Sequence, residues 1–94
     1  ILAITTFETE DEAVALANDT QYGLAASLYT LDVRRAQRVS RRIRAGTVSV
    51  NGFSEGDITA PFGGYKLSGF GGRDKGLEAF DQYTETKVIW YMNA

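Results

Sequence analysis

The segment from Asn51 to Phe62 combines aromatic and acidic side chains, which together can bind a small amphipathic molecule. The rings of Phe53 and Phe62 can form apolar walls. The carboxylates of Glu55 and Asp57 can meet a cationic group at the mouth of such a site. The segment follows a run that we predict to be a parallel strand, and α/β proteins place ligands at such strand ends. From these residues alone, a solvated loop with one core phenylalanine is an equally good interpretation.

The stretch Gly69-Phe70-Gly71-Gly72 is a second chemical candidate, because glycine-rich loops can hold phosphates. Its spacing matches neither the GxGxxG pattern of dinucleotide sites nor the GxxxxGK[ST] pattern of phosphate loops. It also does not lie between a strand and a well-formed helix, whose N-terminus would hold the phosphate. We therefore expect it to carry the chain between elements rather than to bind a phosphate.

Cysteine and histidine are absent from the 94 residues. The chain therefore has no thiolate nucleophile, no imidazole base and no zinc site of the Cys/His kind. Reactive groups for any redox or hydrolytic step must come from elsewhere, so we assign no catalytic residue and no metal ligand.

The net charge of −2 and the pI near 5.0 argue against a general nucleic-acid binder, which is usually basic. No apolar run approaches the roughly 20 residues that span a bilayer, and no signal peptide is visible. We expect one soluble, cytoplasmic globular unit without a nucleic-acid or membrane partner.

The elements that must position these side chains alternate between strand and helix. The apolar run 1–7 predicts a buried strand, and Thr9 with Glu12 forms a capping box for a helix that ends near Asn18. Ala13, Leu16 and Ala17 would give that helix its apolar face. A buried strand needs neighbours on both sides, so its abrupt start leads us to expect a chain cut from a longer one.

A second strand is predicted over residues 24–30. Asp32 predicts the N-cap of a second helix that continues to Ala45, and Gly46 stops it. Residues 47–51 then predict a third strand. Strand, helix, strand, helix, strand at these spacings implies right-handed crossovers and a parallel sheet of the α/β class.

The second predicted helix contains six arginines, and they are Arg34, Arg35, Arg38, Arg41, Arg42 and Arg44. They can form a phosphate or nucleic-acid patch, or a solvated face opposite Ala36, Val39 and Ile43. We favour the solvated face, because no aromatic residues are interleaved for base stacking and the net charge is negative. Weak contact with an acidic partner stays open.

The C-terminal part predicts a short helix over 76–82, with Leu77 and Phe80 inward, and a strand over 83–91. Val88 and Trp90 lie on one face of this strand, and the opposite face is apolar too. Such a strand aggregates if left bare, so it pairs with another chain or domain, or lies centrally in its own domain. The residues favour neither alternative.

Four blocks resemble the C-terminal portion of the NAD(P)-dependent aldehyde dehydrogenase superfamily, in order and at matching spacing, and they are residues 18–26, 44–51, 61–69 and 83–87. The resemblance covers essentially the whole chain. It implies that residues 1–68 are the parallel βαβαβ end of the catalytic domain. Residues 69–94 would be a connecting segment, a short helix and an oligomerisation strand.

The resemblance implies oxidation of an aldehyde to a carboxylate by a cysteine thiolate, a nicotinamide cofactor and a glutamate-activated water. In the family these groups lie upstream of the region present here. NAD or NADP would belong to the parent enzyme, and this chain would bind neither and be inactive alone. Its partners would be the aldehyde, the remainder of the enzyme and a neighbouring subunit of a homo-oligomer.

By the same resemblance, Phe53, Glu55, Asp57 and Phe62 match the loop that lines the substrate entrance. The arrangement Glu55-Gly56-Asp57 is similar to members that oxidise aminoaldehydes, such as γ-glutamyl-aminobutyraldehyde or betaine-type dehydrogenases. There a carboxylate would meet the polar end of the substrate.

Residues 83–91 match the family's terminal strand, which contacts a neighbouring subunit, so Val88 and Trp90 would lie at that interface. Arg73 and Glu85 match an ion pair near the dimer interface. Gly71 and Gly72 depart from the pattern, because the family usually has a single glycine there. The alternative hypothesis is a stand-alone, non-catalytic α/β dimerisation module.

Overall fold

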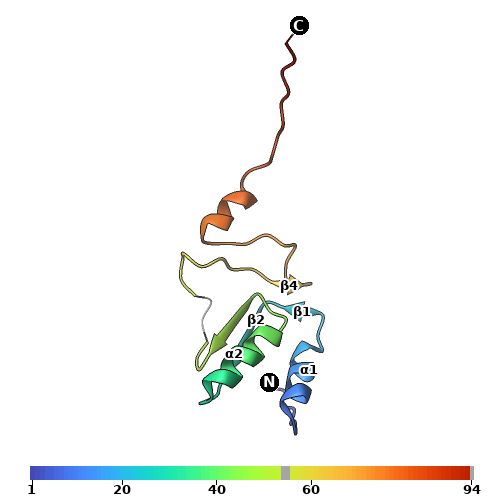
Figure 1. Ribbon diagram of the computed structural model, residues 1–94. Helices are drawn as coiled ribbons and strands as arrows, with labels where there is room; N and C mark the ends of the chain where they lie inside the picture. Colours follow the sequence, from blue (N-terminus) through green and yellow to red (C-terminus); the bar gives the residue numbers. More distant parts are fainter. Residues whose placement is uncertain (54–55, 94) are drawn as a thin grey trace.

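The computed structural model describes residues 1–53 and 56–93 and has an α/β fold (Figure 1). Its elements are α1 (Glu10–Asn18), β1 (Tyr22–Gly23), β2 (Ala25–Leu28), α2 (Val33–Arg42), β3 (Thr47–Val50), β4 (Tyr65–Lys66) and the 3-10 helix η1 (Leu77–Gln82). Strands β2 and β3 pair in parallel, with Ala25 opposite Thr47 and Leu28 opposite Val50. This pair and the helix between its strands confirm the predicted α/β class with a parallel crossover.

Helix α1 begins where the capping pattern predicts. The Thr9 hydroxyl accepts a hydrogen bond from the Glu12 N–H at 3.1 Å. The Glu12 carboxylate accepts from the N–H of Glu8 at 2.9 Å, one residue earlier than an ideal capping box. The buried residue of the helix is Val14, whereas Leu16, which we expected on the apolar face, is 41% exposed.

Helix α2 has the predicted N-cap, because the Asp32 carboxylate accepts from the N–H groups of Arg34 and Arg35 at 2.9 and 3.2 Å. Val39 is buried as expected. The helix ends at Arg42, three residues before the predicted end at Ala45. Ile43 already has extended backbone angles, which turn the chain toward β3 before Gly46 is reached.

Two of the predicted strands have no partner strand within the described chain. Residues 1–7 and 83–91 form no β-ladder with any described part of the chain. A strand needs a partner for its backbone groups, and high β-propensity does not supply one. The predicted three-stranded parallel sheet is therefore reduced to the β2–β3 pair, and the C-terminal residues extend away from the body (Figure 1).

The structure contains a second, antiparallel sheet that the sequence did not predict. Strands β1 and β4 pair with Tyr22 opposite Lys66 and Gly23 opposite Tyr65. Each strand has only two residues, too few for a periodic signal. This pair ties the segment after residue 62 to the end of α1, and so it fixes one end of the candidate loop.

The buried apolar side chains of the described residues are Val14, Val39 and Ala45. The radius of gyration is 18.3 Å, against about 12 Å for a compact chain of this length. The inward positions predicted for Leu77 and Phe80 are wrong, because these side chains are 83% and 68% exposed. The small core holds α1, α2 and β2–β3 together and does not reach the C-terminal part.

In residues 1–53 and 56–93, no helix has both the length and the apolar composition needed to cross a membrane.

Candidate functional site

The candidate site is the loop over residues 51–62, and it leaves the sheet from a fixed point. The Asn51 N–H donates to the carbonyl of Leu28 at 2.7 Å. The Asn51 side-chain oxygen accepts from the N–H of Thr30 at 2.8 Å. Asn51 has a φ of 56°, a left-handed conformation that asparagine tolerates better than most residues. Both contacts anchor the loop to the end of β2.

Phe53 lies just beyond this anchor and its side chain is 85% exposed. Together with residues of β2 and β3, it lines a hollow of about 250 Å³, whose other lining residues are Ala25, Ala26, Ser27 and Ser49. These small side chains leave the space beside the ring open. An apolar group can therefore pack against Phe53 from the sheet side.

Asp57 forms a tight turn with Thr59. Its Oδ1 accepts hydrogen bonds from the N–H and from the hydroxyl of Thr59, the first at 2.8 Å. The bond from the Thr59 hydroxyl is the main reason why the pKa of Asp57 is lowered, with further contributions from backbone N–H groups and from the charge of Lys75. Asp57 therefore presents an ionised, exposed carboxylate on the loop.

Phe62, at the other end of the loop, is half-buried and its backbone is paired with Asp74. The two residues exchange both N–H to carbonyl bonds at 2.6 Å. The Lys75 ammonium stands 5.4 Å from the centroid of the Phe62 ring. A further bond from the Gly76 N–H to the Ile58 carbonyl, at 2.8 Å, ties residues 58–62 to residues 74–76.

The four residues predicted to line a substrate entrance thus have separate surroundings. Phe53 faces the hollow beside β2 and β3, which neither Asp57 nor Phe62 lines. Glu55 lies outside the described residues. That these four residues together line one substrate entrance stays a prediction.

Sequence reasoning missed the residue that anchors the far end of the loop. The Lys66 ammonium donates to the carbonyls of Asn18 and Thr20 at 2.9 and 2.8 Å. The N–H of Leu67 donates to the Gln21 carbonyl at 3.0 Å. The partners are more than 40 residues apart, so no local pattern could have indicated this contact.

Two glycines bring the segment after Phe62 against the segment before β3. A Cβ on Gly46 would overlap the carbonyl oxygen of Gly63, so the two backbones touch directly. The Arg44 guanidinium lies 4.9 Å from the centroid of the Tyr65 ring. Close contact here leaves little freedom for residues 63–65.

The arginines of α2 pair with the acids that open α1. Arg38 forms a bidentate pair with Glu10 at 2.6 and 2.8 Å, and Arg42 reaches Asp11 at 2.8 Å. Arg35 is 3.4 Å from Glu10. The hydrogen bond from Arg38 lowers the pKa of Glu10 to about 2, and the same pair raises the pKa of Arg38. These side chains join α1 to α2, a role that was predicted neither as a phosphate patch nor as a solvated face.

Metal and cofactor binding find no support in the described residues. Within residues 1–53 and 56–93, no group of three acidic, histidine or cysteine side chains could hold a metal ion. Residues 69–72 are irregular, and the next helix, η1, is a single 3-10 segment of six residues. The strand-to-helix cradle that holds a dinucleotide phosphate is missing there, so these residues do not fit NAD or NADP.

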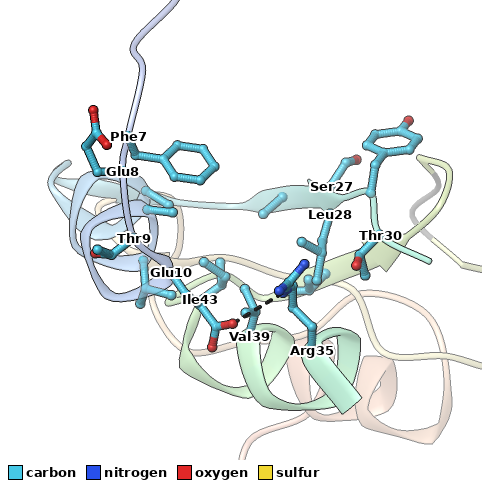
Figure 2. A pocket seen from close by; sticks show the side chains of 16 residues that line it. Phe7, Glu8, Thr9, Glu10, Ser27, Leu28, Thr30, Arg35, Val39 and Ile43 are labelled. Carbon is cyan, nitrogen blue, oxygen red and sulfur yellow. Dashed lines mark ion pairs between the residues drawn. The ribbon is translucent and has the colours of Figure 1, made fainter. Parts of the chain in front are cut away.

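A hollow of about 460 Å³ lies between α1, α2 and β2 (Figure 2). Figure 2 shows Phe7 at one side and the ion pair of Glu10 with Arg35 at another. The core residues Val14 and Val39 line it, so this hollow is a part of the core that the described chain leaves unfilled.

The residues predicted for a subunit interface lie in different surroundings, since Arg73 is half-buried near the Tyr65 ring and the others lie on the C-terminal segment. Arg73 donates to the carbonyl of Gly72 at 2.8 Å, and in the described chain no ion pair joins it to Glu85. Val88 and Trp90 are 71% and 83% exposed on the extended C-terminal segment. Their contact with a neighbouring subunit stays a prediction.

A parallel strand pair with an aromatic and acidic loop at its carboxyl end is the arrangement of α/β proteins that bind ligands at strand ends. Residues 1–89 match the aldehyde dehydrogenase family. The chain is 66% identical over 90 residues to the aminoacetaldehyde dehydrogenase of Pseudomonas aeruginosa. It is 54% identical over 90 residues to the NADP/NAD-dependent aldehyde dehydrogenase PuuC of Escherichia coli. Each alignment covers 96% of this chain and 18% of the relative.

Among solved structures, the apo form of an indole-3-acetaldehyde dehydrogenase matches with a TM-score of 0.86 and 54% identity, over 93% of this chain and 20% of that chain. A related structure, AldA of P. syringae, was solved in complex with NAD⁺ and has a TM-score of 0.81, 54% identity and coverage of 90% and 17%. The chain therefore belongs to the aldehyde dehydrogenase family, a family of oxidoreductases. It spans about a fifth of the length of the curated relatives that it matches.

Proposed function

We propose that this chain is the C-terminal part of an enzyme that oxidises an aminoaldehyde to a carboxylate with NAD or NADP. The observation that carries the proposal is the 66% identity to an aminoacetaldehyde dehydrogenase along 96% of the chain. The NADP/NAD-dependent relative PuuC supports the choice of cofactor class. The cysteine nucleophile and the cofactor site belong to the rest of the enzyme, and its expected location is the cytoplasm.

In this proposal the loop 51–62 lines the entrance through which the aldehyde passes. The exposed ring of Phe53 beside its hollow and the half-buried ring of Phe62 bind the apolar part of the substrate. The ionised carboxylate of Asp57, together with Glu55, attracts its ammonium group. The site therefore selects a substrate with a reactive carbonyl at one end and a positive charge at the other.

The C-terminal residues serve a second purpose, which is assembly. Residues 1–68 complete the catalytic domain, and residues 69–94 connect it to a strand that pairs with a neighbouring subunit. Val88 and Trp90 are exposed on an extended segment, and an apolar segment of this kind aggregates unless it is paired. A homo-oligomer supplies the partner strand and buries both side chains.

Steady-state kinetics of the parent enzyme tests the substrate proposal. Asp57→Asn removes the charge but keeps an oxygen that accepts from Thr59, whereas Asp57→Ala removes both. If Asp57 meets the ammonium group, both variants raise the KM for an aminoaldehyde about two- to fivefold, the strength of an exposed ion pair. The KM for an uncharged aldehyde of the same length stays unchanged.

A different result contradicts the proposal in a recognisable way. If Asp57→Asn behaves as wild type and only Asp57→Ala alters the kinetics, Asp57 acts through its turn with Thr59. If neither variant changes either KM, Asp57 does not contact the substrate. If the parent enzyme reduces neither NAD nor NADP with any aldehyde, the enzymatic proposal itself fails.

A further inference from the structure

Helix α1 lacks a basic residue where its dipole favours one. Its first turn contains Glu10, Asp11 and Glu12, which suit the positive end of the helix, but its last turn contains no cation. Lys66 supplies that charge from another part of the chain. Its ammonium lies 2.9 Å from the carbonyl oxygen of Asn18, the last residue of the helix, and 2.8 Å from that of Thr20.

The backbone of Lys66 is held in an unfavourable conformation to make these bonds. Its φ is 52°, in the left-handed region that lysine rarely adopts. The pairing of Lys66 with Tyr22 in the β1–β4 sheet and the bond from Leu67 to Gln21 fix the same point. Two charge-assisted hydrogen bonds offset the cost of the left-handed backbone, because bonds from an ammonium are stronger than neutral ones.

The three residues between Phe62 and Lys66 couple the position of Phe62 to that of Lys66. Gly63 presses against the backbone of Gly46, Gly64 is buried, and the ring of Tyr65 lies under the Arg44 guanidinium. A segment packed along its whole length cannot absorb a shift at one end. A displacement of Lys66 therefore moves Phe62.

We infer that Lys66 is a positioning residue for the aldehyde-binding ring of Phe62, acting by capping the C-terminal end of α1. The inference rests on the proposed role of the loop 51–62. Lys66 does not touch the substrate. It determines where the ring stands when the aldehyde enters, and so it affects aldehyde binding more than cofactor binding.

A double-mutant cycle in the parent enzyme tests this role. The variants are Lys66→Met, which keeps the aliphatic stem and removes the charge, Phe62→Ala, and both together. We expect Lys66→Met to raise the KM for the aldehyde and to leave the KM for NAD or NADP unchanged. In the Lys66→Met background, the rise in aldehyde KM caused by Phe62→Ala should be smaller by at least about threefold. The displaced ring has by then already lost its contact with the aldehyde.

Two further variants complete the design. Lys66→Arg keeps the charge, so its aldehyde KM should lie between those of wild type and Lys66→Met. Arg41→Met removes a cation from an exposed position of α2 and should leave the KM values for aldehyde and cofactor unchanged. If Lys66→Met does not yield folded enzyme, Lys66→Gln, which keeps one donor group, enters the same cycle.

The outcomes separate the two proposals. If Phe62→Ala raises the aldehyde KM but its effect adds independently to that of Lys66→Met, the entrance proposal stands and the positioning role is overturned. An equal rise in the KM values for aldehyde and cofactor also overturns it, because that result indicates general destabilisation. If Phe62→Ala alone leaves the aldehyde KM unchanged, the proposed role of this ring fails, and the positioning role fails with it.

Discussion

The side-chain oxygen of Asn51 accepts a hydrogen bond from the backbone N–H of Thr30 at 2.8 Å, and this bond joins the two chain segments that leave the parallel strand pair. Thr30 follows β2 and Asn51 follows β3, so both exits are held in register. The bond lies two residues before Phe53. The loop therefore starts from a point that the sheet itself defines.

Removing this bond should destabilise the parent enzyme without distorting its backbone. Asn51→Gly tolerates the φ of 56° but loses the acceptor, so we expect a loss of about 1 kcal/mol in the free energy of unfolding. Asn51→Asp keeps an oxygen acceptor and should stay near wild type. Chemical denaturation of the three proteins measures the difference, and equal midpoints for all three would show that the bond contributes nothing.

The crossing of Gly46 and Gly63 should not accept a methyl group. Gly46→Ala places a Cβ on the Gly63 carbonyl oxygen, and the contacting atoms of Gly63 and Gly64 are all backbone, so we expect about 3 kcal/mol of destabilisation. Gly52→Ala is the matched control, because a Cβ there meets no atom within 4 Å. Thermal unfolding and the yield of folded enzyme compare the two. Equal losses of stability in both variants would contradict the close contact between the backbones of Gly46 and Gly63.

The ion pair between Glu10 and Arg38 should make stability depend on pH in the acid range. The folded pKa of Glu10 is about 2, below its ordinary value of 4.5, so the pair stabilises the fold above pH 4.5. This contribution is lost as the pH falls from 4.5 toward 2. The difference in Tm between wild type and Glu10→Gln should therefore be largest near neutral pH and should shrink below pH 4.5.

The partner of Glu10 provides the control for that measurement. In an Arg38→Met background the carboxylate loses its bidentate partner, so the Glu10→Gln substitution should have a much smaller effect on Tm at every pH. A difference that persists unchanged in this background would assign the effect to the neighbouring Arg35 instead.

The proposed subunit interface predicts that Glu85→Lys loosens the oligomer. The substitution reverses a charge on the segment that we propose to pair with a neighbour, close to the expected position of Arg73. Sedimentation velocity of the parent enzyme measures the change in mass distribution. Glu78→Lys, the same charge change on η1, is the control. Identical sedimentation of Glu85→Lys and wild type would remove Glu85 from the interface.

The features that sequence predicted correctly depend on near neighbours in the chain. Thr9 and Asp32 cap their helices because a short polar side chain bonds N–H groups two or three residues ahead. The parallel pairing of β2 with β3 follows from a right-handed crossover, which the order of the elements already implies. The packing of acids on α1 against arginines on α2 was missed, because it joins residues about 30 positions apart.

The candidate loop shows the same division. The types of its residues suited an amphipathic ligand and a solvated loop equally well, and the ligand site stays a prediction. Its anchors, Asn51 with Thr30 and Lys66 with the end of α1, emerged only from the structure.

By itself, the sequence determined the family, the helix starts and the parallel strand pair. The four blocks, the capping residues and the order of the elements are all patterns of residues that lie near one another in the chain. The tertiary structure alone decided that residues 1–7 and 83–91 have no ladder here, that β1 pairs with β4, and that Lys66 closes α1. The physical reason is that β-ladders, and helix caps such as Lys66, need partners from distant segments of the same chain. The β-propensity of a residue indicates that it suits a strand but does not indicate where the partner strand lies.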